Sequence, residues 1–411
     1  MSSKNDSRGA ALLDDPGDVE HQDGCDESLY ASLAGALEVF APLARENPEN
    51  HVAWHAFVEG QSLARPDMPS FAEYQRWDVE KRVAFDDARK RYHSGFGPIR
   101  SAVMKKVHET LMRLAFDNLS APPGARQGGI LDGPGTLGKT TILLHLGRIY
   151  ERKLRPLFED AADKAGIAEF VPVVYVSVPS STTPKKLLTS LCQFYGEPIS
   201  YRDSETTLKD KLRACVRACG TSLILLDDIH NLHRGNKSAE SVNDLIKELA
   251  NKLPVTFVHA GINCENSVLL MDGKTGVDER FTQTQYRFTL FQVQPFTYDV
   301  DQPESEWLSL LDVMESHLRL FKYEKGALRK QKSYLYARTQ GGMGNLSRLI
   351  RGAANHAIRT GEEQLKKTVF DAVELPYAAE VAYGELLARL NHTGGSFEEL
   401  FTGKNKGKKG K

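Results

Sequence analysis

The chain has 411 residues, with 53 basic and 54 acidic side chains that give a net charge of -1. Domains cluster at roughly 100 to 200 residues, so this length predicts two or three structural units. A hydrophobic fraction of 41% and a charged fraction of 26% are ordinary for a globular protein and exclude a wholly disordered or collagen-like chain. No stretch approaches the ~20 apolar residues that span a bilayer. The five cysteines suit neither a disulfide framework nor a zinc site, which favours a cytoplasmic location.

The two ends of the chain carry opposite charges. Residues 1–27 contain eight acidic and two basic side chains and lack the apolar stretch of a secretory signal, so we expect a disordered acidic leader. Residues 28–122 place apolar side chains at helical spacing, which predicts a helical N-terminal region. Five of the last eight residues are lysines, so we expect residues 391–411 to form a basic, disordered tail.

Between these regions, short apolar runs alternate with amphipathic helices. Buried strands separated by helices predict an α/β fold, a parallel sheet flanked by helices, in a core of residues 123–296. Only helices are expected afterwards, which predicts an all-helical domain at 297–390. The expected strands are 129–131, 171–178, 222–226, 255–260 and 287–293. The expected helices are 139–150, 184–195, 241–253 (with Ser241 and Asp244 as a capping box), 305–321, 326–339, 345–360 and 363–390.

A phosphate-binding loop follows the first expected strand, where residues 133–140 fit G-x-x-x-x-G-K-[ST] at every specified position. Glycines let backbone N–H groups turn toward triphosphate oxygens, and the start of the next helix adds partial positive charge. We expect Lys139 to reach the β- and γ-phosphates and the Thr140 hydroxyl to ligate Mg²⁺. The predicted cofactors are therefore ATP and Mg²⁺. The predicted nucleotide-binding residues are Gly133, Pro134, Gly135, Thr136, Leu137, Gly138, Lys139, Thr140 and Thr141.

Two carboxylates end the strand expected at 222–226. We expect Asp227 to hold the Mg²⁺ shell and Asp228 to orient and deprotonate the attacking water. One whole expected strand, 171–178, lies between this pair and the phosphate-binding loop. That order suits the additional-strand class of P-loop NTPases.

Four runs together resemble an AAA+ ATPase, and within that class the TniB/TnsC family of transposition regulators: residues 133–141, 174–187, 225–232 and 341–350. The resemblance covers about residues 90 to 360. It implies an AAA+ core followed by a helical lid domain. It also implies a regulator that assembles on double-stranded DNA without sequence preference, as a homo-oligomeric ring or helical filament, and that recruits or activates a transposase. The implied partners are that transposase and a targeting protein of the TniQ type, and no interaction with a membrane is expected.

The resemblance assigns further roles in ATP hydrolysis. Asn263 matches a polar sensor, and Arg348 matches the sensor arginine of the lid. Arg280 matches the arginine finger that reaches a neighbour's γ-phosphate, with Arg287 as its competitor. Residues 93–98 lie where this clade places its adenine contacts.

One departure from the family pattern concerns the catalytic base, because most AAA+ proteins carry Glu where this chain has Asp228. The shorter side chain sets the base back from the water, which predicts slow hydrolysis that serves regulation.

For DNA, we expect Lys185 and Lys186 to contact phosphates at a helix start that Thr183 caps. The basic tail is the rival source of DNA affinity. Two other functions remain open: a replication-initiator or helicase-loader ATPase, and a signalling or defence NTPase that acts on a protein partner.

Overall fold

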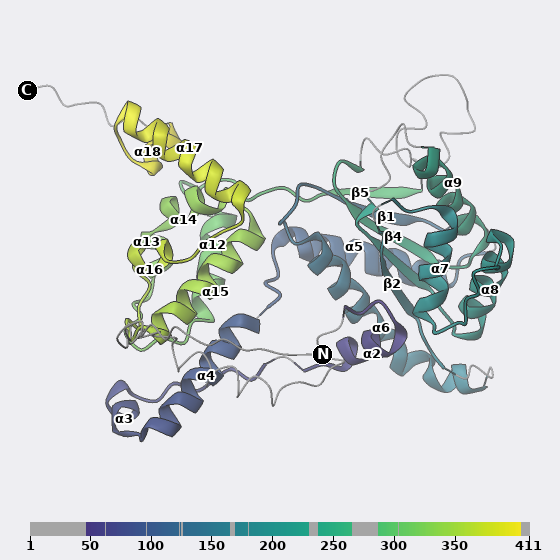
Figure 1. The fold of residues 1–411 in the computed structure, drawn as a ribbon, viewed down its shortest axis with the longest axis horizontal. Helices are drawn as coiled ribbons and strands as arrows, with labels where there is room; N and C mark the ends of the chain where they lie inside the picture. Colours follow the sequence, from purple (N-terminus) through teal and green to yellow (C-terminus); the bar gives the residue numbers. More distant parts are fainter. Residues whose placement is uncertain are drawn as a thin grey trace, which may run out of the picture. The chain divides into compact units, whose positions relative to one another are not determined.

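A five-stranded parallel sheet forms the centre of the α/β part (Figure 1). The computed structural model describes residues 47–403, except 62, 96, 123, 125, 165–168, 180, 230–236, 265–286 and 303. The sheet order is β2-β3-β4-β1-β5, and every neighbouring pair is parallel. The predicted α/β class is therefore confirmed. The strands are β1 (Gly128–Asp132), β2 (Val173–Ser177), β3 (Leu223–Asp227), β4 (Thr256–Gly261) and β5 (Phe288–Gln292).

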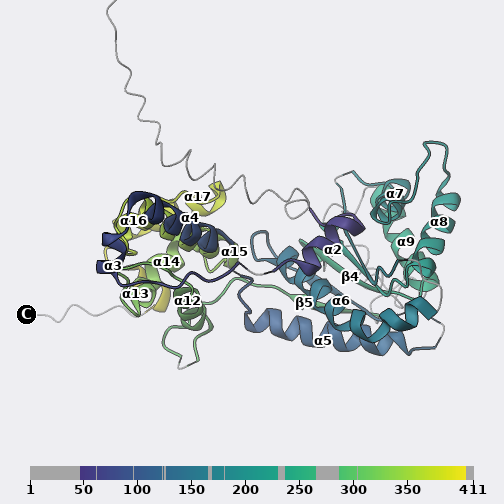
Figure 2. The same cartoon turned by 90° about the horizontal axis from the view of Figure 1, so that it is seen from below.

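Helices cover both faces of this sheet, which explains why β1, β3 and β4 are buried at every position (Figure 2). One face carries α5 (Ala102–Leu119) and α6 (Lys139–Lys164), and the other carries α7 (Pro184–Phe194) and α9 (Lys237–Lys252), with α8 (Glu205–Ala218) packed on α7. The register pairs Leu131 with Ala260 and Ser177 with Asp227. Parallel strands therefore bring the ends of β1 to β4 to one edge of the sheet.

The helical domain that follows the sheet has its own apolar core. In α15, buried residues recur at helical spacing from Leu346 to Ile358 and pack with Trp307 and Phe370. An amphipathic helix of this kind is stable mainly through the packing of its apolar face. The helices are α12 (Glu306–Ser316), α13 (Ala327–Lys330), α14 (Lys332–Thr339), α15 (Met343–Arg359), α16 (Lys367–Asp371), α17 (Tyr377–Thr393) and α18 (Phe397–Thr402).

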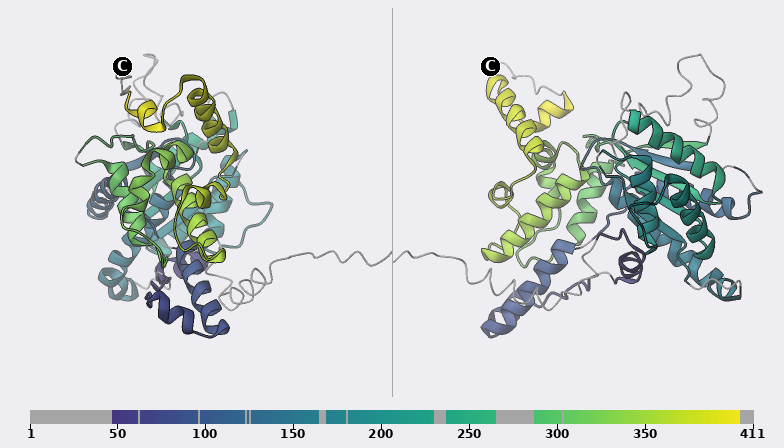
Figure 3. Two further views of the ribbon diagram at one scale, coloured as in Figure 1. Left: turned by 90° about the vertical axis from the view of Figure 1, so that its left-hand side faces the viewer. Right: turned by 45° about the vertical axis from the view of Figure 1, so that its right-hand side comes forward.

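The N-terminal helices contribute to both of these cores. The helices are α2 (His51–Glu59), α3 (Phe71–Arg76) and α4 (Val79–Gly95). Trp54 of α2 is buried in the sheet core, whereas Tyr92 of α4 is buried in the helical core. Helix α4 packs along α15 (Figure 3). The region is helical as predicted, and its described part packs into the two cores on either side.

Several helix boundaries differ from the prediction. Helix α6 continues to Lys164 and contains Pro156. Helix α9 begins at Lys237, so Ser241 lies inside it and the predicted capping box is wrong. Helix α8 was not predicted, although Ser204 caps it by accepting a hydrogen bond from Thr207 N.

The end of the helical domain also differs. The helix expected at 363–390 is two helices, because Pro376 interrupts the pattern and becomes the N-cap of α17. Helices α17 and α18 extend into the expected tail, and Ser396 with Glu399 forms a capping box at the start of α18. The leader and residues 404–411 lie outside the described residues. No helix in the described part of the chain is long and apolar enough to cross a bilayer.

Candidate nucleotide-binding site

The phosphate-binding loop connects β1 to α6 and needs glycine at its first position. Gly133 has φ +157°, and a Cβ there would lie 2.1 Å from the carbonyl oxygen of Val293. The loop brings Lys139 to the first turn of α6, where its Nζ donates to the carbonyl oxygens of Gly133 (2.8 Å) and Pro134 (2.6 Å). Burial lowers the pKa of Lys139, and the nearby Asp227 carboxylate opposes that shift. A buried cation next to backbone N–H groups can bind phosphate oxygens.

Asp227 lies at the end of β3, with 2% of its surface exposed. Burial raises the pKa of this carboxyl, and a side-chain hydrogen bond with Thr140 lowers it. The backbone N–H of Asp228 donates to its Oδ1 at 2.9 Å. The predicted pair of metal ligands, one hydroxyl and one carboxylate, is therefore in contact. Hydroxyl and carboxylate oxygens are the hard ligands that Mg²⁺ takes from proteins, so these residues fit that ion.

Asp228 follows β3 in the left-handed region, with φ +57°. A non-glycine residue there carries backbone strain of order 1–3 kcal/mol, and such strain clusters at functional sites. The Ser177 hydroxyl, at the end of β2, donates to Asp228 Oδ2 at 3.1 Å. This contact was not predicted. The parallel register between β2 and β3 creates it, because Ser177 pairs with Asp227.

Asn263 follows β4, the strand between β1 and β3. It is exposed and has φ +55°. Buried Asp132, the last residue of β1, accepts a hydrogen bond from Cys264 N at 2.9 Å and so fixes the turn that carries Asn263. Asp132 was not predicted, although an acidic residue at the end of an apolar strand is a signal that the sequence contains. The turn lies at the same sheet edge as Asp227.

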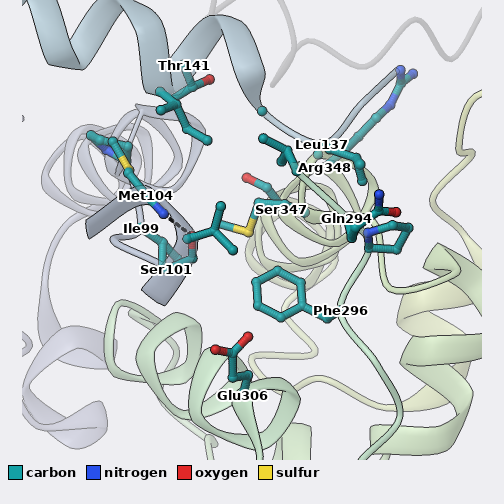
Figure 4. A pocket seen from close by; sticks show the side chains of 18 of the residues that line it. Ile99, Ser101, Met104, Leu137, Thr141, Gln294, Phe296, Glu306, Ser347 and Arg348 are labelled. Atoms are coloured by element: carbon teal, nitrogen blue, oxygen red, sulfur yellow. Dashed lines mark hydrogen bonds between the residues drawn. The ribbon is translucent and has the colours of Figure 1, made fainter. Parts of the chain in front are cut away.

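A cavity of about 720 Å³ adjoins the phosphate-binding loop (Figure 4). Its walls come from the loop and α6, from residues 94–104, from the end of β5 and the residues after it (292–297), from Glu306 of α12, and from α15. Apolar side chains such as Ile99, Met104 and Phe296 face it. The N–H of Gly344 on α15 donates to Thr136 O at 2.8 Å, which joins the helical domain directly to the loop. The walls combine apolar side chains with polar ones such as Gln294, Glu306 and Asn355, and a cavity of this size is typical of small-molecule sites.

The cavity brings several predicted residues together. Leu137, Gly138, Thr141 and Arg348 line it, and Arg348 is an exposed residue of α15. Ser94 and Pro98 from the expected adenine segment line it too.

The predicted arginine finger, Arg280, lies outside the described residues. Its competitor Arg287 donates to the side chain of Asn251 in the same chain.

Lys185 and Lys186 lie in the first turn of α7 and do not line the nucleotide cavity. Thr183 is the N-cap, as predicted, and accepts a hydrogen bond from Lys186 N at 3.3 Å. Lys185 Nζ donates to Tyr201 O at 3.1 Å, and Lys186 Nζ donates to Ser181 O at 3.3 Å. Lys185 thus contacts the loop that joins α7 to α8, and Lys186 contacts the segment that precedes α7.

Comparison with known proteins gives one family match. Residues 99–294 match the family model described as the bacterial TniB protein. No curated protein sequence matches the chain.

Solved structures with a similar fold include the Orc1 protein of Aeropyrum pernix in complex with DNA, which is 16% identical and has a TM-score of 0.47. The match covers 71% of this chain and 66% of the Orc1 chain, which is slightly under two thirds of the Orc1 length. The ORC2 protein of Aeropyrum pernix in its ADPNP–ADP complexes matches with 16% identity over 70% and 72% of the chains and a TM-score of 0.49. The RuvB Holliday junction branch migration motor of Thermotoga maritima matches with 15% identity over 65% and 66% and a TM-score of 0.34.

Proposed function

Because residues 99–294 match the TniB family model, we propose that this chain is an AAA+ ATPase of that family and an ATP-dependent, DNA-binding regulator of transposition. It assembles on double-stranded DNA in its ATP state as a ring or helical filament and recruits or activates a transposase, together with a targeting protein of the TniQ type. ATP hydrolysis then disassembles it. The observation that carries this proposal is that the phosphate-binding loop and Arg348 line one cavity, while the Asp227 carboxylate is hydrogen-bonded to Thr140 of the same loop.

The nucleotide would lie with its base in the cavity and its phosphates at the loop. Ile99, Met104 and Phe296 provide apolar surfaces for a flat ring. Lys139 reaches the phosphates, and Thr140 with Asp227 would hold Mg²⁺, which supplies positive charge to the phosphate oxygens when bound. Arg348 projects from α15 at the same cavity, so a bound triphosphate would join the helical domain to the sheet.

Hydrolysis depends on Asp228 in this proposal. Its carboxylate accepts the Ser177 hydrogen bond, which fixes the side chain near the end of β3. A fixed carboxylate can orient a water and accept its proton. Since Asp is one methylene shorter than Glu, we expect turnover to be slow. Asn263, on the neighbouring turn, would contact the attacking water or the γ-phosphate.

Oligomer formation would complete the site from a neighbouring subunit. Arg287 is engaged with Asn251 in its own chain, which supports Arg280 as the residue that reaches the neighbour's γ-phosphate. We expect oligomers with a non-hydrolysable ATP analogue and monomers with ADP, as light scattering would show. Arg280→Ala should abolish the oligomer while nucleotide binding is kept. A monomer in every nucleotide state would contradict this part of the proposal.

The DNA contact would lie at the first turn of α7. Lys185 and Lys186 stand at the positive end of a helix, a combination that attracts phosphates without reading bases. The adjoining Tyr201 is 81% exposed, and the Arg202 guanidinium lies 5.3 Å from its ring centroid. The Arg202 guanidinium therefore adds positive charge near the lysine pair that can contact the phosphate backbone.

Nucleotide binding is tested first with Lys139→Ala, and Lys153→Ala serves as the control on an exposed face of the same helix. Titration with a fluorescent ATP analogue should show lost affinity in Lys139→Ala and unchanged affinity in Lys153→Ala. Calorimetry checks that both variants are folded. A folded Lys139→Ala variant with normal ATP affinity would refute the site.

DNA binding is tested with the double variant Lys185→Ala, Lys186→Ala. The matched control is Lys366→Ala, Lys367→Ala, another adjacent and exposed pair at a helix start. With the ATP analogue, the Lys185→Ala, Lys186→Ala variant should bind duplex DNA more weakly. The slope of its log affinity against log salt concentration should be smaller in magnitude by about 1 to 2. The control should match the wild type.

If removing residues 403–411 abolishes binding and the double variant does not, the tail is the DNA contact. If the full chain with ATP binds no duplex at low salt, a switch that acts on a protein partner replaces the transposition proposal.

A further inference from the structure

Asp227 is held by a second strand as well as by its own. The Tyr175 hydroxyl, on β2, donates to Asp227 Oδ2 at 3.2 Å, while the backbone N–H of Asp228 donates to Oδ1. A phenol hydroxyl is protonated at neutral pH and a carboxylate oxygen can only accept, so Tyr175 is the donor in this contact. Both carboxylate oxygens of Asp227 thus have a fixed hydrogen bond.

The position of Tyr175 is in turn fixed by the N-terminal helix α2. Tyr175 is 5% exposed, and the Trp54 ring stacks on it with centroids 6.2 Å apart and planes 19° apart. The Trp54 indole N–H donates to Glu151 Oε2 at 2.7 Å, and Glu151 also accepts a hydrogen bond from Arg155 at 2.6 Å. An aromatic pair of this kind, anchored by a buried hydrogen bond, leaves the tyrosine ring little freedom.

We propose that Tyr175 is a positioning residue for the metal-ligating carboxylate of Asp227, and that helix α2 holds Tyr175 in place through Trp54. Partners that hydrogen-bond to a ligating carboxylate fix its orientation, and their loss typically weakens metal affinity by about 10- to 100-fold. The inference rests on the proposed nucleotide function, because Asp227 has its metal role only there. Tyr175, on β2, would then influence Mg²⁺ binding in addition to Thr140 of the phosphate-binding loop and Asp227 at the end of β3.

The test is Tyr175→Phe, which removes the hydroxyl and keeps the ring. Tyr150→Phe is the matched control, since the Tyr150 hydroxyl is also buried but bonds to Ser222, just before the opposite end of β3 (2.9 Å). Binding of a fluorescent ATP analogue is measured against free Mg²⁺ and again with EDTA. For Tyr175→Phe, the Mg²⁺ concentration at half-saturation should rise about 10-fold, with metal-free nucleotide affinity unchanged. Tyr150→Phe should alter neither quantity.

A second variant, Trp54→Phe, shrinks the stacked surface and leaves the Tyr175 hydroxyl present. It should shift the Mg²⁺ requirement in the same direction by a smaller factor. If Tyr175→Phe keeps the wild-type Mg²⁺ requirement, or if its nucleotide affinity falls as much without Mg²⁺ as with it, Tyr175 has only a structural role. The inference is then wrong, while the proposed function stands. If nucleotide binding by the wild type itself ignores Mg²⁺, the metal role of Asp227 and the inference fall together.

Discussion

The most sharply defined prediction concerns a buried ion pair between α4 and the helical domain. The Arg89 guanidinium is 0% exposed and donates to both carboxylate oxygens of Glu363 at 2.8 Å, to Asp86 at 2.6 Å and to Arg319 O at 3.1 Å. Burial lowers the pKa of Arg89, but the hydrogen bonds and charges of Glu363 and Asp86 together outweigh it, so the net pKa is raised. The guanidinium therefore stays charged inside the protein.

Arg89→Met keeps most of the side-chain volume and leaves Glu363 as a buried carboxylate without its cation. Breaking a buried pair from one side costs about 3–5 kcal/mol, much more than the pair contributes relative to an apolar replacement. We expect a loss of that size in the free energy of unfolding. Part of the Glu363 charge is still met by the backbone N–H of Phe321, which donates to Oε2 at 3.1 Å. The lower half of the range is therefore the better expectation.

Urea unfolding followed by circular dichroism measures this loss. The control is Lys330→Met, which breaks an ion pair with Glu324 of the same 2.8 Å length at an exposed site. Exposed pairs contribute little, so this variant should unfold like the wild type. The double variant Arg89→Met, Glu363→Leu should recover most of the stability. A loss below about 1 kcal/mol for Arg89→Met would refute the reasoning, because that is the size expected of a solvent-exposed pair.

Three further outcomes follow from the site and its surroundings. Ser177→Ala removes the hydrogen-bond donor to Asp228 and should lower ATP turnover about 10-fold, which is the effect of losing one hydrogen bond to a charged group. The affinity for ATP should not change, and an altered affinity would contradict this prediction. Gly344→Val places a Cβ 2.5 Å from Thr136 O, so binding of the ATP analogue should weaken by about 1–3 kcal/mol, and normal binding would show that the contact is dispensable. Burial, aided by the Arg89 charge, lowers the pKa of His93 to about 4, so the unfolded state binds the proton more readily. The contribution of neutral His93 to the free energy of unfolding is present above pH 6.5 and is lost as the pH falls toward about 4, a loss of up to about 3 kcal/mol. In His93→Gln, the free energy of unfolding should therefore depend less on pH in this range.

The phosphate-binding loop and the two carboxylates after β3 could be predicted because each is a contiguous run whose local geometry follows from residue type. The sheet could be predicted for a similar reason, since its strands are short apolar runs between helices. Arg348 needed the family resemblance, because nothing local distinguishes it from a surface arginine. Arg348 lines the cavity beside the phosphate-binding loop, and its sensor role stays a prediction.

The hydroxyl donors to the carboxylates could not be predicted. Tyr175 and Ser177 reach Asp227 and Asp228 only because β2 lies beside β3 in a particular register, and the sequence pattern does not determine register between strands 50 residues apart. The start of α9 was misplaced for a different reason. Ser241 and Asp244 have the residue types of a cap, but the helix already continues through them from Lys237.

The division of the N-terminal helices between two cores has a consequence for isolated fragments of this protein. A fragment that begins at residue 99, where the family match starts, would lack Trp54 and Arg89. The sheet core would then expose the apolar surface that Trp54 covers, and Glu363 would be left buried without its cation. Such a fragment should aggregate or unfold on expression. The matched segment, residues 99–294, therefore leaves out side chains that are buried in the sheet core and in the helical domain.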